Sequence, residues 1–136
     1  MFFKTNLREI HMSTMINVLV VDDEAYMMEV VAWMAKKSGV NMSRASTRVE
    51  MEKFLGESSF DAILMDGNLS GWGTTHEPNF PGAWVVHELR GRGITTKIFM
   101  FSSDEERLAE GIALGANGVF SKRKSDWKEL VQLVKS

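Results

Sequence analysis

The stretch that most constrains this chain is the apolar run Ala62-Ile63-Leu64-Met65, which is followed at once by Asp66 and Gly67. A continuous apolar run between turn residues is typical of a strand buried on both faces, as in a parallel sheet. Ligands of open parallel sheets bind at the carboxyl ends of the strands. The sequence therefore predicts that Asp66 stands at such an end, with the backbone turning away through Gly67.

Strand-like and helix-like segments alternate along the rest of the chain. This alternation predicts an α/β fold with a doubly wound, flavodoxin-like parallel sheet of five strands, in the order 2-1-3-4-5, between two layers of helices. Besides the apolar run, strands are expected at Ile16–Val21, Val40–Ala45, Lys97–Phe101 and 118–121. Five helices are expected, from about Ala25 to Lys37, from Thr47 to Gly56, from Gly82 to Arg90, from Ser103 (with Glu106 in a capping-box pattern) to Leu114, and from Ser125-Asp126 onward.

Length, charge and cysteine content bound the class of protein. A chain of 136 residues is expected to form one domain, here 15–136, preceded by a leader at 1–14 that is disordered or derived from cloning. The net charge of −2 argues against direct nucleic-acid binding. Because the chain has no cysteine and no apolar run of about 18–20 residues, we expect a cytoplasmic protein that does not cross a membrane.

Polar side chains follow four of the five strands and would meet at one edge of the sheet. Asp22 and Asp23 follow the first strand, Asp66 the third, Ser102 the fourth and Lys122 the fifth. Three close carboxylates repel one another unless a cation joins them, and an all-oxygen set suits Mg²⁺. Asp66, which stands alone, is the best candidate for a nucleophile toward phosphorus, with Lys122 and Ser102 contacting the phosphoryl oxygens.

Four motifs in this order carry a resemblance to a known family. They are VLVVDDE at 18–24, ILMD at 63–66, IFMFSS at 98–103 and ALGANG at 113–118, which leads to Lys122. With these motifs, residues 15–136 resemble the receiver domain of response regulators in two-component signalling.

The resemblance implies a role for each candidate residue. Asp66 would accept a phosphoryl group from a histidine kinase or a histidine phosphotransfer protein. Asp22, Asp23, Asp66 and the backbone carbonyl of Asn68 would hold Mg²⁺. Ser102 matches the family's hydroxyl position and Lys122 its lysine, and phosphorylation would shift the domain to an active conformation. The expected partners are the phosphodonor, an unknown effector and, on phosphorylation, a second copy of the chain.

The sequence departs from the family pattern at three places. Arg123 stands where the family usually has proline, and Val119, next to Phe120, stands where it often has an aromatic residue. The segment at 67–81, expected to be a loop, is longer than usual. We expect this segment to overhang the acceptor and to modulate partner choice or phosphate lifetime.

Two other functions are alternatives to a phosphoacceptor. A phosphohydrolase with an aspartyl nucleophile would place Asp-x-Asp after the first strand, whereas Asp22 and Asp23 are adjacent here. A degenerate receiver would serve only for docking or dimerisation, without phosphorylation. Elsewhere, Trp33, Trp84 and Trp127 are expected to be core or half-buried side chains, and Leu108 and Ile112 to be buried.

Overall fold

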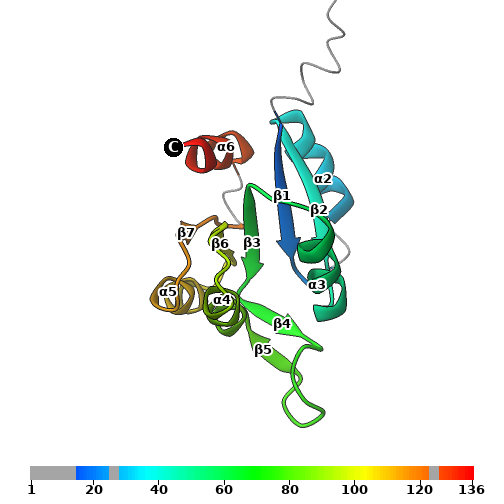
Figure 1. Cartoon of the computed structure of the whole chain (residues 1–136), viewed down its shortest axis with the longest axis vertical. Helices are drawn as coiled ribbons and strands as arrows, with labels where there is room; N and C mark the ends of the chain where they lie inside the picture. Colours follow the sequence, from blue (N-terminus) through cyan, green and yellow to red (C-terminus); the bar gives the residue numbers. More distant parts are fainter. Residues whose placement is uncertain (1–14, 25–27, 123–125) are drawn as a thin grey trace, which may run out of the picture.

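Five parallel strands form one sheet in the order β2-β1-β3-β6-β7 (Figure 1). The computed structural model describes residues 15–24, 28–122 and 126–136, so the expected leader at 1–14, the helix start near Ala25 and Arg123 lie outside the described residues. The predicted α/β fold and strand order are confirmed. The strands are β1 (Ile16–Val21), β2 (Val40–Ala45), β3 (Ala62–Asp66), β6 (Lys97–Phe101) and β7 (Gly118–Val119).

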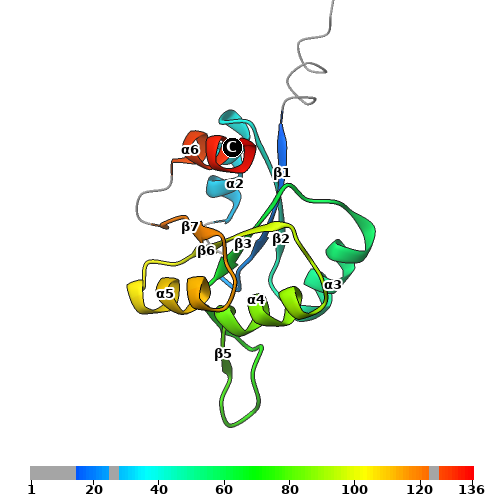
Figure 2. The same cartoon turned by 60° about the vertical axis from the view of Figure 1, so that its left-hand side comes forward.

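Helices cover both faces of the sheet in the described parts of the chain. One face is covered by α2 and α6, and the other by α3, α4 and α5 (Figure 2). None of the helices described is both long enough and apolar enough to cross a membrane. The helices are α2 (Met28–Lys37), α3 (Arg48–Glu57), α4 (Gly82–Gly91), α5 (Glu105–Ala113) and α6 (Trp127–Lys135).

Side chains of β1 alternate between the two halves of the core. Val18 and Val20 pack on the side of α2 and α6, whereas Leu19 and Val21 pack on the side of α3 and α4. This alternation follows from the period of two in a strand, and burial on both faces requires the continuous apolar run. All four side chains are fully buried. The core therefore fixes the register of the strands, and with it the position of their polar ends.

The helix starts follow the expected capping chemistry, with one correction. Thr47 caps α3, accepting a hydrogen bond from the Glu50 amide at 3.1 Å. The prediction that Ser103 caps α5 is wrong, because Asp104 is the capping residue and its carboxylate accepts from the Glu106 amide at 3.0 Å. Serine and aspartate are both favoured at the N-cap of a helix. Here it is the Asp104 carboxylate that lies two residues before an unpaired amide of the first turn.

The segment at 67–81 is not an irregular loop, and that prediction was wrong. It contains an antiparallel β-hairpin of β4 (Asn68–Ser70) and β5 (Asn79–Pro81). Figure 1 shows this hairpin projecting beyond the carboxyl end of β3. Leu69 pairs with Phe80 and is completely buried in the core beneath the hairpin. The base of the hairpin is therefore part of the folded domain.

Some buried positions also differ from expectation. Trp127 is buried, as expected, but Trp33 and Trp84 are 60% and 54% exposed on the outer faces of α2 and α4. Ile112, expected to be buried, is 46% exposed. The last strand is also shorter than expected, since β7 ends at Val119. Helical spacing shows which residues share a face, but not how far the neighbouring elements cover its margins.

Candidate functional site

The carboxyl ends of the central strands bring the expected polar residues together. β1 and β3 are neighbours in the sheet, so Asp22, just after β1, lies beside Asp66 at the end of β3. Asp66 in turn pairs with Phe101, the last residue of β6, so that Ser102 follows immediately. Both Asp22 and Asp66 are buried, with 2% and 5% of their surface exposed, and Ser102 is 5% exposed.

Lys122 supplies the positive charge of the site. Its Nζ lies 2.8 Å from Oδ2 of Asp22 and 3.5 Å from Oδ1 of Asp66. Glu24 lies at the rim, with its carboxylate 3.9 Å from the same Nζ. Lys122 therefore bridges Asp22, which follows β1, and Asp66, which ends β3. The two strand ends converge at the lysine, as predicted.

Asp22, Asp23 and Asp66 form a cluster that could bind a metal ion. One carboxylate oxygen from each lies within 4.8 Å of the others. Backbone amides orient two of these groups, because Glu24 donates to Oδ1 of Asp22 at 2.8 Å and Ser70 to Oδ2 of Asp23 at 3.2 Å. An all-oxygen set of this size suits a hard divalent cation that keeps several of its waters.

The electrostatics of the cluster agree with a cation site. Burial, and next the negative charge of Asp22, raises the pKa of Asp66 to about 8, although Lys122 opposes the shift. Burial alone would lower the pKa of Lys122, but its hydrogen bond to Asp22 and the charge of Asp66 raise that pKa overall. One ammonium group thus leaves the three acids short of positive charge, which a divalent ion would supply.

Asn68 and Ser102 both lie close to Asp66 at the end of β3. The Asn68 amide donates to Oδ1 of Asp66 at 3.3 Å, whereas the predicted use of the Asn68 carbonyl as a metal ligand stays a prediction. The Ser102 Oγ accepts a hydrogen bond from the Asp104 amide at 3.0 Å. A Cβ added at Gly67 would lie 3.1 Å from that Oγ, so the hydroxyl is already close to the end of β3.

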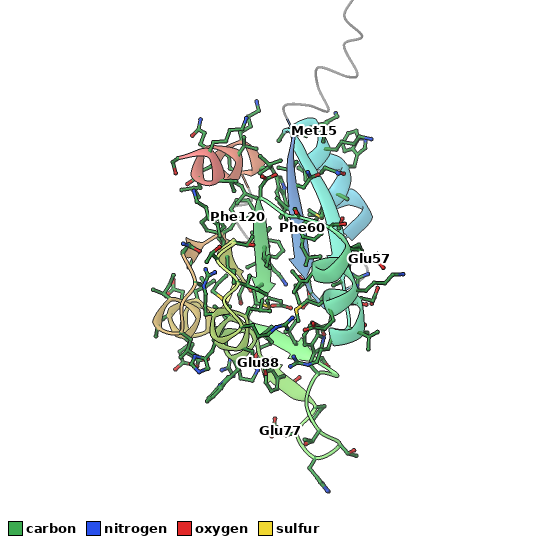
Figure 3. All side chains as sticks on the ribbon, in the orientation of Figure 1. Met15, Glu57, Phe60, Glu77, Glu88 and Phe120 are labelled. Carbon is green, nitrogen blue, oxygen red and sulfur yellow. The ribbon has the colours of Figure 1, made fainter. Side chains whose placement is uncertain are left out.

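An aromatic cluster lies beneath the lysine. Lys122 Nζ is 5.1 Å from the centre of the Phe101 ring, which stacks on Phe120 with a centroid distance of 6.0 Å. Phe120 in turn contacts Trp127 at 5.0 Å. Phe120, labelled in Figure 3, is buried, whereas Val119 is 45% exposed. Phe120, the aromatic residue that follows β7, therefore has its side chain in the core.

Sequence reasoning missed the contact between the hairpin and the acidic cluster. The Ser70 amide in β4 reaches Asp23, and no catalytic residue type marks position 70. A signal for the hairpin was present, since Leu69 and Phe80 each stand between polar or turn-forming residues in a segment rich in glycine and proline. Two strands of three residues are too short for this alternation to be distinctive.

Comparison with known families assigns the chain to one family. The family described as the response regulator receiver domain matches residues 18–135. This chain belongs to that family. Receiver domains are signalling modules and not enzymes, so the phosphohydrolase reading is set aside. They pair with histidine kinases, and the cluster of Asp22, Asp23 and Asp66 is the acidic pocket of this receiver.

Solved structures show the same fold. The chemotaxis response regulator CheY4 of Vibrio cholerae is 26% identical, with a TM-score of 0.69 over 89% of this chain and 99% of that one. The receiver domain of the TorR response regulator is 24% identical, with a TM-score of 0.68 over 88% and 92%. NtrX from Brucella abortus is 18% identical, with a TM-score of 0.71, and this chain covers 26% of its length. No curated protein sequence matches this one.

Proposed function

We propose that this receiver is a phosphoacceptor and that Asp66 takes a phosphoryl group from a phosphohistidine. The observation that carries the proposal is the position of Lys122 Nζ, 2.8 Å from Asp22 and 3.5 Å from Asp66, within a cluster that includes Asp23. In this arrangement one carboxylate is central, two others stand beside it, and one ammonium faces them. Together with a divalent cation, such a set can bind and orient a phosphoryl group.

The proposed transfer is a displacement at phosphorus. A carboxylate oxygen of Asp66 forms the new O–P bond while the bond from phosphorus to the donor imidazole breaks. The electron pair of the broken bond goes to the imidazole nitrogen, which takes a proton from water. Because burial raises the pKa of Asp66 to about 8 in the absence of a cation, its proton must leave before attack.

Asp22, Asp23 and Asp66 would hold Mg²⁺, with the Asn68 carbonyl as the expected fourth protein ligand. When bound, Mg²⁺ supplies positive charge that favours ionised Asp66 and offsets the charge of the phosphoryl group. Lys122 would then exchange part of its contact with Asp66 for a phosphoryl oxygen. Ser102 would donate its hydroxyl hydrogen to another, since a hydroxyl that accepts one bond can still donate.

We propose a histidine kinase or a histidine phosphotransfer protein as the donor, acting in the cytoplasm. Support comes from the family, whose members pair with histidine kinases. Phosphorylation would draw Ser102 and the start of α5 toward Asp66 and so change the outer faces of α5, β7 and α6. An effector protein, or a second phosphorylated copy of the chain, would read that change.

Intact-mass spectrometry with acetyl phosphate tests the proposal. We expect a gain of one phosphoryl group in the presence of Mg²⁺, no gain after chelation, and none in Asp66→Asn. Size-exclusion chromatography of the labelled protein then reports any dimer. A receiver that acts only as a docking module would remain unlabelled under the same conditions, and that result would refute phosphotransfer to Asp66.

A further inference from the structure

The β4–β5 hairpin contributes directly to the acidic cluster. The Ser70 amide in β4 donates to Oδ2 of Asp23 at 3.2 Å. One residue earlier, Leu69 is fully buried in the core between the sheet and α4. The strand therefore has one side chain fixed in the core while its next amide orients one of the three acids. Any movement of β4 away from the domain would remove that amide from Asp23.

Arg48, the first residue of α3, fastens the hairpin to the rest of the domain. Its guanidinium carbon lies 5.3 Å from the centre of the Trp72 ring and 5.5 Å from that of Phe80. These distances are within the range of cation–π attraction. The same guanidinium donates to Glu88 on α4 at 2.8 Å. Arg48 of α3 thus contacts a residue just after β4, a residue of β5 and a residue of α4.

A second bond fixes the hairpin on the same side. The indole Nε1 of Trp72 donates to the backbone carbonyl of Ser46 at 3.0 Å, in the turn that leads from β2 to α3. Trp72 is therefore held at its edge by this turn and over its face by Arg48. Figure 3 shows Glu88 on α4 near the base of the hairpin and Glu77 near its outer end. The contacts gather at the base, which is the part next to Asp23.

We propose that Arg48 is a positioning residue for the metal site. By holding Trp72 and Phe80, it keeps β4 where the Ser70 amide orients Asp23 toward Asp22 and Asp66. This inference rests on the proposed function, because it assumes that the three acids hold a divalent cation. Residues that orient metal ligands commonly change metal affinity by about 10- to 100-fold, and Arg48 acts one step further away. We therefore expect a smaller effect, of about three- to tenfold.

The chain offers a matched control for Arg48. Arg92, just after α4, forms an ion pair with Glu52 of α3 at 2.6 Å. It too joins α3 to α4 through a partly exposed arginine and glutamate, but within the described residues its side-chain hydrogen bonds go to Glu52 and none reaches the hairpin. Arg92→Ala therefore reproduces the loss of an ion pair between these helices without the loss of the stack on Trp72 and Phe80.

Titration of the full chain with MgCl2 tests the proposal. The NMR signals of Gly67 and Asn68 report binding, and the Kd is compared among wild type, Arg48→Ala and Arg92→Ala. Hydrogen exchange of the Ser70 amide is measured in each, and urea unfolding establishes that each is folded. We expect Arg48→Ala to raise the Kd for Mg²⁺ about three- to tenfold and to speed exchange at Ser70. Arg92→Ala should change the Kd by less than about twofold.

The outcomes separate this inference from the proposed function. If Arg48→Ala and Arg92→Ala bind Mg²⁺ equally well, or if exchange at Ser70 is unchanged, Arg48 has no positioning role, and labelling of wild-type Asp66 by acetyl phosphate is unaffected by that result. If wild type binds no Mg²⁺ and is not labelled, both proposals fail together. If Arg48→Ala does not fold, Trp72→Phe is used, which keeps an aromatic ring at position 72 and removes the hydrogen bond to Ser46. An unchanged Kd in that folded variant refutes the role of the hairpin.

Discussion

Replacing Gly82 with alanine tests how closely α4 is packed against the end of β3. Gly82 begins α4, and its amide donates to the Gly67 carbonyl at 2.9 Å. An added Cβ would overlap the backbone carbonyl oxygen of Asp66 and would lie 2.9 Å from its carbonyl carbon. The glycine is not required by its φ angle, which is not positive. It is required because the backbone of Asp66 occupies the space.

The cost follows from what must move. Relieving the overlap requires α4 and the end of β3 to separate, since neither backbone atom can rotate away as a flexible side chain would. Overpacking costs about 1–3 kcal/mol, and loss of the bond between Gly82 and Gly67 adds about 1 kcal/mol. The better helix propensity of alanine returns at most about 1 kcal/mol. We expect Gly82→Ala to lower the free energy of unfolding by about 3 kcal/mol, which is the upper end of the range for overpacking, because backbone atoms collide.

Urea unfolding measures this effect, with Gly91→Ala at the other end of α4 as the control. A Cβ at Gly91 would meet nothing within 4 Å, so that variant should be as stable as wild type or up to about 1 kcal/mol more stable. With a slope of about 1.5–2 kcal/mol per M, the Gly82→Ala midpoint should fall by about 1.5–2 M. A midpoint within experimental error of wild type would refute the packing argument, whereas a chain unfolded without denaturant would agree with it.

Three further predictions concern the site, the hairpin and a helix cap. In the folded chain the pKa of Asp66 is raised to about 8, so the contribution of this carboxyl to stability is full below about pH 4 and is lost as the pH rises through 8. Asp66→Asn should therefore be more stable than metal-free wild type by about 2 kcal/mol or more at pH 8, and by progressively less toward pH 4. Urea unfolding at each pH measures this difference. Leu69→Ala should lower the free energy of unfolding by about 2–4 kcal/mol, whereas Thr75→Ala at the exposed end of the hairpin should change it by less than about 0.5 kcal/mol. Asp104→Ala should cost about 1 kcal/mol in thermal unfolding and Ser103→Ala less than about 0.5 kcal/mol.

Each of these predictions has a result that contradicts it. If the difference in stability between Asp66→Asn and wild type stays constant from pH 4 to pH 8, the Asp66 carboxyl is not the group that titrates. A Leu69→Ala chain as stable as wild type would mean that the base of the hairpin lies outside the cooperative core. Equal effects of Asp104→Ala and Ser103→Ala would leave the capping residue of α5 unassigned.

The sheet and the acidic cluster could be predicted from the sequence because both depend on the ends of apolar runs. Leu64 and its neighbours have to be buried on both faces, which fixes a parallel sheet, and its topology then places Asp22 beside Asp66. Lys122 could be placed by the same reasoning, although β7 has only two residues. In these cases one strong local pattern and one topological rule decide the position.

The remaining features depend on contacts that no local pattern records. Arg48 looks like an ordinary surface residue in the sequence, and its role appears only where α3, the hairpin and α4 meet. Trp84 was expected to be a core or half-buried side chain, but it is 54% exposed, because no element among residues 15–24, 28–122 and 126–136 covers the outer face of α4 at that position. Ser103 and Asp104 both suit a helix start, and the position of the first turn selects between them.

The hydrogen bond between the Gly82 amide and the Gly67 carbonyl brings the two ends of the hairpin segment together at a distance of 2.9 Å. A segment whose ends already meet can change in length at its outer turn with only a small additional loop-closure entropy. The exposed turn between Thr74 and Glu77 is therefore the place where this receiver would accept an inserted epitope, fluorophore site or sensor peptide. Such an insertion would report from the outer end of a hairpin whose strand β4 reaches Asp23, while leaving the parallel sheet and its register unchanged.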